Sequence, residues 1–274
     1  MISTFLKEFV NKSLGIFGLQ VHGKSAVPRR SFVEALQHAS NLGLLPATVL
    51  DVGAAYGTFT VECHNIFPES RYLLIEPLQE YKSYLDKVIK AVPKAEYILS
   101  AAAAKRGEVN INVHPDLVGS STYLEREGSD VNGVPRTVPA ETLDNLCEDK
   151  NASGPYLVKV DVQGAELDVL SGATKVLNET EYLILEVSLF EFFEGGPQFY
   201  DVVHYMKSCG FVVYDIFGLQ YRPLDNAMSQ VDMAFVRDKS QFRKYHFYGT
   251  KKQREEQTKR FLELRNRGFY DDER

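Results

Sequence analysis

The segment Thr48–Thr60 reads TVLDVGAAYGTFT, and it indicates a strand, a tight turn and the start of a helix. An apolar run ends at Asp51 and Val52, small residues follow, and a helical pattern opens near Thr58. Small side chains in such a turn leave room for a ligand beside the backbone, and the free N–H groups of a helix start attract its polar groups. The segment therefore predicts a nucleotide-like ligand site after the first strand.

The spacing within this loop favours S-adenosylmethionine (SAM) over a dinucleotide. Asp51 is followed by Gly53 at plus two, by the small Ala55 at plus four and by Gly57 at plus six. This is the register D/E-x-G-x-G-x-G of SAM sites, with alanine in the middle. The dinucleotide fingerprint G-x-G-x-x-G would need glycine at Ala55 and at Thr58. Close packing of a strand against a helix is the alternative reason for two glycines here.

Composition and charge indicate an ordinary globular protein. The chain has 274 residues, of which 44 % are hydrophobic and 25 % charged, enough for one domain of ~200–250 residues with appendages. The net charge of −6 argues against a nucleic-acid partner. Three separated cysteines without metal-ligand spacing predict reduced thiols and a cytoplasmic location. No apolar run reaches the ~18 residues of a transmembrane segment.

Both ends of the chain have helical patterns. Apolar residues recur at helical intervals from Ile2 to Phe17, without the features of a signal peptide. We expect a helix that packs on the domain or on a second subunit of a homo-oligomer, or one that makes a peripheral membrane contact. The predicted division is an N-terminal helical extension over residues 1–46, a main domain over 47–240 and a charged, solvated helical tail over 241–274.

Strands alternate with helices along most of the main domain. Expected strands cover residues 48–52, 71–75, 96–99, 108–113, 156–160, 182–187, 211–216 and 232–236. Expected helices cover residues 31–44, 58–67, 78–91, 164–177 and 199–208, with a mobile loop over 115–135 and a non-helical connection over 217–231. This order predicts a mostly parallel sheet covered on both faces, a three-layer α/β/α architecture, with an antiparallel pair at one edge.

An acid at the end of the second predicted strand supports a nucleoside ligand. Glu76, followed by Pro77, lies nineteen positions after Gly57. One carboxylate there can accept both ribose hydroxyls. Ala101 and Ala102, after the third strand, would let a flat adenine lie against the backbone, although a helix start explains the alanines equally well.

Three further segments resemble the FkbM family of SAM-dependent methyltransferases. Residues 156–173, YLVKVDVQGAELDVLSGA, are similar to its signature K-(I/V)-D-(V/I)-E-G-(A/x)-E-x-x-V-L-x-G-A. Residues 138–144, VPAETLD, resemble its "T-L-D" strand, and residues 184–187, ILEV, its fifth-strand "L-x-E-V". The resemblance covers roughly residues 49–236. Gln163 departs from the usual glutamate, and Ala55 from the usual asparagine or glycine.

The resemblance implies a Rossmann-like class I methyltransferase domain over residues 47–240, with a seven-stranded, mostly parallel sheet and an antiparallel edge strand. It implies O-methylation of a hydroxyl on a sugar, a glycan or a related natural product. The cofactor would be SAM, and the residues expected to line it are Asp51, Gly53, Ala54, Ala55, Tyr56, Gly57, Thr58, Phe59, Glu76, Pro77, Ala101, Ala102 and Asp161.

Asp161 and Glu186 are the main candidates for catalysis, because they end adjacent strands at the ligand-bearing rim of the expected sheet. An alcohol holds its proton at neutral pH, so either carboxylate could be the base, or both could bind a divalent cation such as Mg²⁺ that acidifies the hydroxyl. A helix cap at Asp161 and a structural partner for Glu186 are the alternatives. Lys159 shares a strand face with Asp161 and could pair with it or orient the acceptor.

Two loops provide further candidates. His114 precedes the segment 119–123, which could fold over the cofactor, and a histidine is an alternative base near neutral pH. Residues 190–197, FEFFEGGP, could stack on and hydrogen-bond a sugar acceptor, or could form a packed aromatic cluster.

Two other classes of function fit the sequence less well. An NAD-dependent sugar oxidoreductase or epimerase is disfavoured by the glycine register and by the lack of a Tyr-x-x-x-Lys pair. A non-catalytic SAM-fold module that binds a partner through its terminal helices is disfavoured by the presence of Asp51, Glu76 and Asp161.

Overall fold

The computed structural model describes residues 29–128 and 131–266, and the chain divides after Asp238 into two units. The first unit contains a seven-stranded sheet, whose order and bounds are β3 (Ala95–Ile98), β2 (Arg71–Ile75), β1 (Thr48–Val52), β7 (Tyr156–Val160), β8 (Thr180–Ser188), β10 (Met228–Arg237) and β9 (Phe211–Tyr221). The strands β3, β2, β1, β7 and β8 pair in parallel, and β10 is antiparallel to both β8 and β9. The predicted fold class is confirmed, with the antiparallel strand one place in from the edge.

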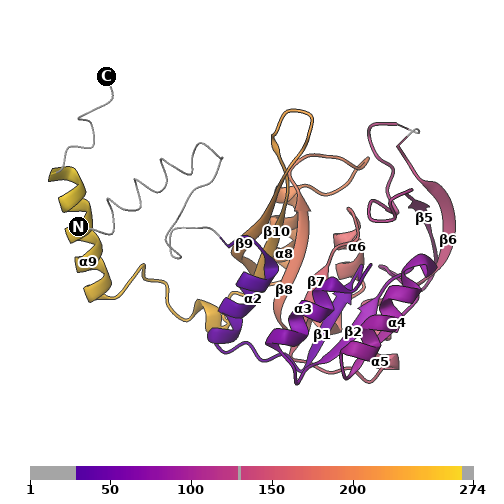
Figure 1. Ribbon diagram of the computed structural model, residues 1–274, viewed down its shortest axis with the longest axis horizontal. Coiled ribbons are helices and arrows are strands. Elements are labelled where there is room, and N and C mark those ends of the chain that lie inside the picture. The colour runs from indigo at the N-terminus through magenta and orange to yellow at the C-terminus, as the bar shows by residue number, and fades with distance from the viewer. Residues whose placement is uncertain (1–28, 129–130, 267–274) are drawn as a thin grey trace. The chain divides into compact units, whose positions relative to one another are not determined.

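Helices cover both faces of this sheet (Figure 1). One face carries α2 (Phe32–Asn41), α3 (Thr58–Ile66) and α4 (Lys82–Ala91), the last preceded by a 3-10 turn, η2 (Gln79–Tyr81). The other face carries α5 (Leu143–Asp149), α6 (Glu166–Ser171), α7 (Thr174–Asn178) and α8 (Phe199–Ser208). Val158 and Val160 of β7 pack in the hydrophobic core with side chains of α5 to α8. Because side chains alternate along a strand, Lys159 points to the face of α2 to α4.

A second sheet of three strands follows β3 in the chain. Its order is β4 (Ala101–Ala102), β6 (Val134–Glu141) and β5 (Gly107–Val113), with β5 antiparallel to β6. The hairpin strand expected over 108–113 is therefore present. The loop expected over 115–135 ends earlier, because β6 begins at Val134. This strand includes two prolines, Pro135 and Pro139. Proline is tolerated there because β4 pairs only with Ala140 and Glu141, which leaves one side of β6 free.

Two local predictions were wrong. The helix expected over 164–177 is two short helices, because the chain bends at Gly172, where a Cβ would lie 2.4 Å from the carbonyl oxygen of Ala103. The "T-L-D" strand expected within residues 138–144 ends at Glu141 with β6, and the remainder starts a helix: the Thr142 hydroxyl accepts a hydrogen bond from the N–H of Asn145 at 3.2 Å and caps α5.

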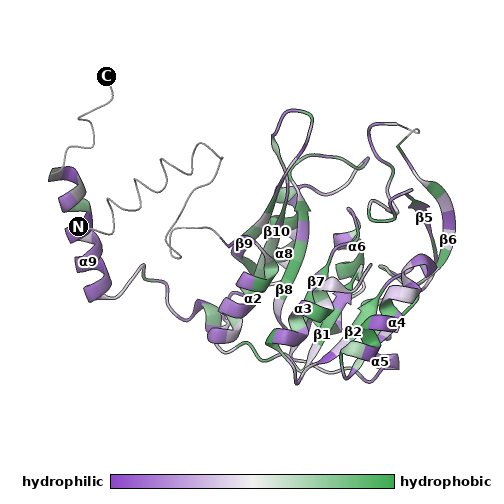
Figure 2. Cartoon of the chain, in the orientation of Figure 1, coloured by the Kyte–Doolittle hydropathy of each residue, from purple (hydrophilic) through white to green (hydrophobic). Residues whose placement is uncertain are grey.

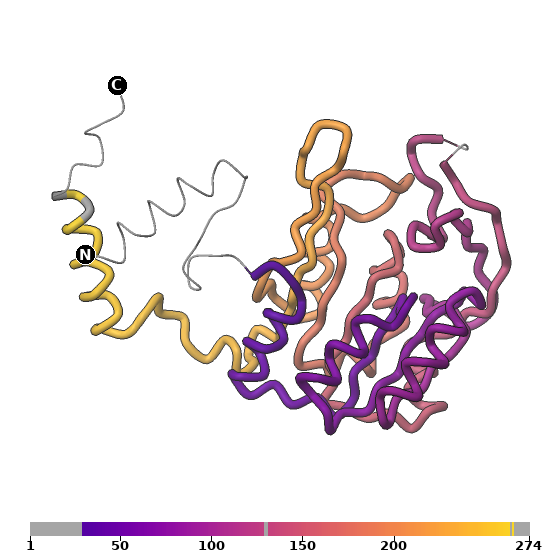
Figure 3. Tube along the Cα trace, in the orientation of Figure 1, coloured from indigo at the N-terminus to yellow at the C-terminus, as the bar shows by residue number. Residues whose placement is uncertain are grey.

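The last two strands are longer than expected. β9 and β10 extend through most of the segment 217–231, which was expected to be a non-helical connection. The Cα trace shows the hairpin that they form projecting past the neighbouring strands (Figure 3).

The second unit contains a 3-10 turn, η3 (Gln241–Arg243), and the helix α9 (Lys251–Asn266). Figure 2 shows α9 as mostly hydrophilic, in contrast to the strands of the first unit. Its exposed side chains include the i,i+4 pairs Lys251–Glu255 and Lys252–Glu256, both at 4.0 Å. The helix expected over residues 2–17 lies outside the described residues, and the predicted division of the whole chain stays a prediction.

Candidate active site

The loop between β1 and α3 is held tightly against the ends of two neighbouring strands. The N–H groups of Gly53 and Ala54 donate to the Ile75 carbonyl of β2 at 2.9 and 3.2 Å. Gly53 has φ +74°, and a Cβ at this position would lie 1.8 Å from the Asp161 carbonyl oxygen. Ala55 also adopts a left-handed conformation, with φ +45°, at the position where SAM loops usually have glycine. The tight turn that the sequence predicts is present.

Glu76, at the end of β2, reaches back to this loop. One carboxylate oxygen accepts from the N–H of Ala55 at 2.9 Å, and the other accepts from the N–H of Leu78 at 2.8 Å. The residue is 4 % exposed, and this burial raises the pKa of Glu76 to about 7 even though the two N–H groups lower it. A carboxylate can accept about four hydrogen bonds. Glu76 therefore keeps acceptor capacity for a ligand.

Glu76 lies in the wall of a cleft with about 740 Å³ of empty space, counting its open mouth. We call it the nucleoside cleft. Its lining residues are Val52, Gly53, Ala55, Ile75, Glu76, Pro77, Leu78, Tyr81, Ala101, Ala102, Ile111, Leu117, Val118, Ser120, Ser121, Thr122, Asp161, Val162, Gln163 and Ala165. Most of these residues are apolar, and the two acids among them are Glu76 and Asp161, a set that suits a flat base and a ribose.

A second cleft, with about 780 Å³ of empty space, lies beside the same loop. We call it the acceptor cleft, and it is lined by Phe32, Gly53, Ala54, Ala55, Tyr56, Thr58, Phe59, Lys159, Asp161, Ile184, Glu186, Gln220 and Asp232. The two clefts share Gly53, Ala55 and Asp161. A group held in one cleft can therefore approach a group held in the other at this junction.

Asp51 lines neither cleft, although the sequence analysis placed it beside the cofactor. Its side chain is 1 % exposed beneath the loop, where it accepts a hydrogen bond from the Thr60 hydroxyl at 2.8 Å. The Lys159 ammonium lies 3.8 Å from its other oxygen, which has no hydrogen-bond partner among the described residues. Burial raises the pKa of Asp51, against the lowering effect of Lys159 and Thr60. Asp51 supports the start of α3 and the position of Lys159.

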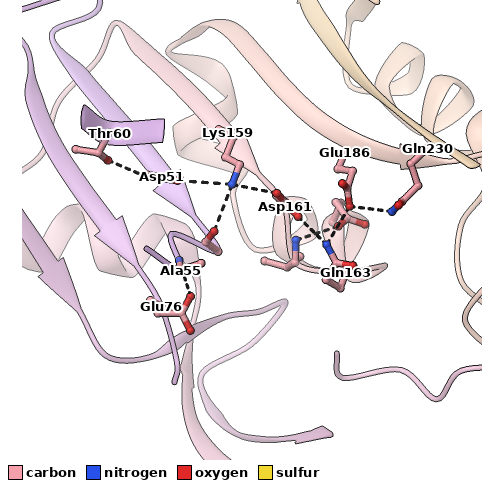
Figure 4. Close-up of polar contacts among 12 residues, drawn as sticks. Asp51, Ala55, Thr60, Glu76, Lys159, Asp161, Gln163, Glu186 and Gln230 are labelled. Carbon is pink, nitrogen blue, oxygen red and sulfur yellow. Dashed lines mark hydrogen bonds and ion pairs between the residues drawn. The ribbon is translucent and has the colours of Figure 1, made fainter. Parts of the chain in front are cut away.

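The candidate catalytic acids belong to one polar network at the rim of the sheet (Figure 4). Lys159 lies 3.2 Å from Asp161 and donates to the Gly53 carbonyl at 3.3 Å. The Gln163 amide donates to Asp161 at 2.9 Å and to Glu186 at 3.0 Å. The structure thus brings together the two acids that the sequence analysis selected, and Lys159 pairs with Asp161 as one of the two alternatives proposed.

Glu186 accepts two more amide hydrogen bonds from the β9–β10 hairpin. Gln220 donates at 3.2 Å and Gln230 at 2.9 Å. Asp232 faces the same cleft and is directly opposite Glu186 in the strand register. Sequence reasoning missed these three hairpin residues. Their alternation along the strands was a usable signal, but only with the knowledge that β10 pairs with β8.

Burial also sets the charge of this network. It disfavours the ammonium of Lys159, but Asp161 and Asp51 outweigh it and raise the pKa of Lys159. Burial, followed by the nearby Asp161 carboxylate, raises the pKa of Glu186 and raises that of Asp232 to about 7. Glu186 therefore holds a proton more readily than an exposed glutamate does.

These raised pKa values predict that stability falls as pH rises through neutrality. Glu76, Glu166 and Asp232, each with a pKa of about 7, and Glu186 bind protons more tightly in the folded than in the unfolded chain. Between about pH 5 and 7 the folded chain binds more protons than the unfolded chain, so the free energy of unfolding decreases as the pH rises. Tm of the unmodified chain should therefore fall between pH 5.5 and 8. In Glu186→Gln we expect this fall to be smaller by roughly 3 °C or more, which corresponds to about 1 kcal/mol of unfolding free energy in a chain of this size.

The measurement is a series of thermal melts from pH 5.5 to 8. Glu108→Gln, which changes an exposed carboxylate on β5, is the matched control and should leave the slope unchanged. A Tm of the unmodified chain that rises steadily over this range would contradict the prediction.

The described side chains do not fit the divalent cation that Asp161 and Glu186 were expected to hold if a metal is used. The Gln163 amide donates to both carboxylates, so hydrogen-bond donors occupy the space between the acids. Within residues 29–128 and 131–266, no group of three or more His, Cys, Asp or Glu side chains could hold a metal ion. Divalent cations such as Mg²⁺ prefer a shell of oxygen ligands.

Of the other candidate residues, His114 lies apart from this network, whereas the Ser121 hydroxyl donates to the Gln163 carbonyl at 2.6 Å. His114 is in neither lining set, and its imidazole pairs with Asp116 at 2.8 Å. Ser120, Ser121 and Thr122, from the loop expected to cover the cofactor, do line the nucleoside cleft. Asp161 does not cap α6, whose N-cap is Ala165.

The aromatic loop over 190–197 lines neither cleft. Phe193 is 8 % exposed and packs against Gly164, where a Cβ would lie 2.8 Å from its ring. The guanidinium of Arg222 lies 3.9 Å from the centre of the Phe190 ring. The rings of Phe190 and Phe193 are therefore packed against other residues, as the second interpretation expects, while a place for this cluster under the C-terminal helix stays a prediction.

Comparison with known proteins gives one family match. The model described as the methyltransferase FkbM domain matches residues 51–213. Hexuronic acid methyltransferase AglP of Haloferax volcanii is 28 % identical over 141 residues, which cover 50 % of this chain and 54 % of that protein. The 2-O-methyltransferase NoeI of Sinorhizobium fredii is 24 % identical over 161 residues, which cover 54 % of this chain and 65 % of that protein.

The chain thus spans between half and two thirds of the length of these two relatives. Among solved structures, an FkbM methyltransferase from Methylobacillus flagellatus matches with a TM-score of 0.48 and 17 % identity, over 76 % of this chain and 48 % of that chain.

Proposed function

Because the chain belongs to the FkbM methyltransferase family, we propose that it transfers the methyl group of SAM to a hydroxyl oxygen of a sugar or glycan acceptor. The family match confirms the resemblance and the SAM-dependent methyltransferase class of enzyme. The acceptor is supported by two relatives, one named for hexuronic acid and the other as a 2-O-methyltransferase. The single observation that carries the proposal is the pair of clefts that meet at Gly53, Ala55 and Asp161.

The nucleoside cleft suits SAM. Glu76 has acceptor capacity for the ribose hydroxyls, and Ala101 and Ala102 offer small side chains beside the base. The buried Tyr81 hydroxyl in the same cleft has no hydrogen-bond partner in the part of the chain that the structure describes. Gly53 and Ala55 lie at the junction with the acceptor cleft. When bound, SAM supplies a methyl group on a positively charged sulfur.

Asp161 is the base in this proposal. It lines both clefts, whereas Glu186 lines the acceptor cleft only, has a raised pKa and already accepts from three glutamine amides. Lys159 and Gln163 fix the Asp161 carboxylate in place. Asp161 takes the proton of the attacking hydroxyl, and alignment at the junction supplies much of the remaining acceleration.

The test is transfer of an isotope-labelled methyl group from SAM to a panel of glycosides, with the labelled atom located by NMR. The proposal expects the label on a sugar oxygen. Binding of S-adenosylhomocysteine (SAH) without transfer to any sugar would favour the non-catalytic module, and binding of NAD without SAH would favour the oxidoreductase. Three further expectations stay predictions: the cytoplasmic location, a homo-oligomer and a membrane contact of the N-terminal segment. No helix in the described ranges is long and apolar enough to cross a membrane.

Glu76→Ala is expected to weaken SAH binding by roughly 10- to 100-fold. The change removes an acceptor for the ribose and leaves the N–H groups of Ala55 and Leu78 without their partner, and hydrogen bonds to charged groups contribute about 1.5–3 kcal/mol each. Calorimetric titration with SAH measures the effect. Glu69→Ala, at a side chain 94 % exposed, is the control and should bind as the unmodified chain does. Equal affinities for all three proteins would remove Glu76 from the cofactor site.

A further inference from the structure

We propose that the acceptor cleft selects a sugar without an acidic group and rejects a uronic acid. This inference rests on the proposed function and narrows it to a substrate class. It concerns the part of the cleft formed by β8, β10 and β9, which lies on the side of Asp161 away from β1 in the strand order.

The side chains of these three strands form a carboxylate and amide surface. Glu186 of β8, Asp232 of β10 and Gln220 of β9 line the cleft, and Asp232 is directly opposite Glu186 in the register. Gly218 of β9 allows this packing, because a Cβ there would lie 2.3 Å from an Asp232 carboxylate oxygen. The surface therefore presents mostly hydrogen-bond acceptors to whatever occupies the cleft.

Asp232 is the group in this surface that lacks a partner. Asp161 is bonded by Lys159 and Gln163, and Glu186 by three glutamine amides. Within the described chain, no hydrogen bond or ion pair reaches the Asp232 carboxylate, which is partly buried in the wall of the cleft. An acceptor that a ligand shields from water is unfavourable unless the ligand provides a donor. A hydroxyl or ammonium group of the acceptor would supply the missing donor.

Among the described residues that line the cleft, no cationic side chain is free to receive an acidic acceptor. Lys159 is the one cationic side chain among the residues that line the cleft, and it already interacts with Asp51, Asp161 and the Gly53 carbonyl. Above the raised pKa values of Asp232 and Glu186 both groups are ionised, and a sugar carboxylate placed here would then lie beside two like charges without compensation. Like charges in a partly buried site repel strongly.

An apolar wall completes the cleft. Phe32 and Phe59 line it with their ring centres 4.9 Å apart. Phe59 is 6 % exposed and the Lys159 ammonium lies 5.9 Å from its ring centre, so Phe32 supplies most of the ring surface available to the C–H groups of a sugar. Together with the acceptor groups opposite, the two rings suit a hydroxyl-rich ring that is neutral or cationic. The hexuronic acid named for one relative is an acceptor that this cleft is expected to reject.

The experiment compares three methyl glycosides that differ only at C6: methyl glucoside, methyl 6-amino-6-deoxyglucoside and methyl glucuronide, with the galactose and mannose series in parallel. Transfer from labelled SAM, measured at a pH above the raised pKa values of Asp232 and Glu186, gives kcat/KM for each glycoside. We expect kcat/KM for the glucuronide type to be at least tenfold below that for the neutral sugar, and the amino sugar to be used at least as well as the neutral one.

Asp232→Asn tests the residue assignment. It removes the charge and is expected to reduce the neutral-to-uronate ratio of kcat/KM by at least threefold. Asp149→Asn is the matched control, because Asp149 is an exposed carboxylate at the end of α5 that lines neither cleft, and its ratio should be that of the unmodified chain. The comparison of sugars with the unmodified chain holds even if a variant fails to fold.

Each outcome decides the matter. Equal or better use of the uronates overturns the inference, while O-methylation of those sugars would leave the proposed function standing. Discrimination that Asp232→Asn leaves unchanged overturns the assignment to Asp232. No transfer to any sugar, with SAH still bound, overturns the proposed function and this inference together.

Discussion

Asp161→Asn is expected to lower kcat by at least about 100-fold while changing the Kd for SAH by less than about threefold. General base catalysis contributes about 10² to 10⁴ in rate, and an asparagine amide cannot accept the hydroxyl proton. The substitution keeps the shape of the side chain, and Lys159 keeps its contact with Asp51. The loss should therefore appear in the chemical step and not in cofactor binding.

Single-turnover kinetics with labelled SAM and calorimetry with SAH separate these two effects. Asp149→Asn serves again as the control, since it alters an exposed carboxylate outside both clefts. A variant that binds SAH normally and keeps more than a third of kcat would show that Asp161 is not the base. Glu186, the other candidate acid of the network, would then be the candidate base.

Gly53→Ala is expected to weaken SAH binding by at least about 100-fold and to lower Tm. The new Cβ would lie 1.8 Å from the Asp161 carbonyl oxygen, so the loop or the end of β7 must move. Both clefts share Gly53 and Asp161, so this movement disturbs the junction at which the reaction is proposed to occur. The φ of +74° adds about 1–3 kcal/mol of backbone strain for a residue with a Cβ.

Gly195→Ala isolates the strain from the collision. Gly195 has φ +70°, close to that of Gly53, and a Cβ there would meet no atom within 4 Å. We expect this control to lose a little stability and to bind SAH normally. If Gly53→Ala and Gly195→Ala show the same Kd for SAH and the same Tm, the close approach of the loop to β7 does not contribute to cofactor binding.

The core strands and the cofactor loop could be predicted from the sequence, because their signals are local. Apolar runs at Thr48–Val52, Arg71–Ile75 and Tyr156–Val160 are strands with those bounds. Strand alternation placed Lys159 and Asp161 on one face, and the structure joins them at 3.2 Å. Each of these inferences uses residues within a few positions of one another.

The elements that escaped prediction depend on contacts between distant segments. β6 contains prolines that argue against a strand. They are tolerated because β4 leaves one side of β6 free, while β5 pairs with the other side. The break between α6 and α7 comes from the approach of Gly172 to Ala103, about seventy residues earlier. Gln220, Gln230 and Asp232 join Glu186 only because β10 inserts between β8 and β9.

A crystal structure of the chain with saturating SAH would show whether the loop after β1 and the acid at the end of β2 bind the cofactor. We expect density in the nucleoside cleft, with the ribose hydroxyls within hydrogen-bond distance of Glu76 and the sulfur at the junction beside Gly53 and Asp161. Density for SAH at any other place, or a cleft that stays free of SAH at saturating concentration, would contradict this expectation.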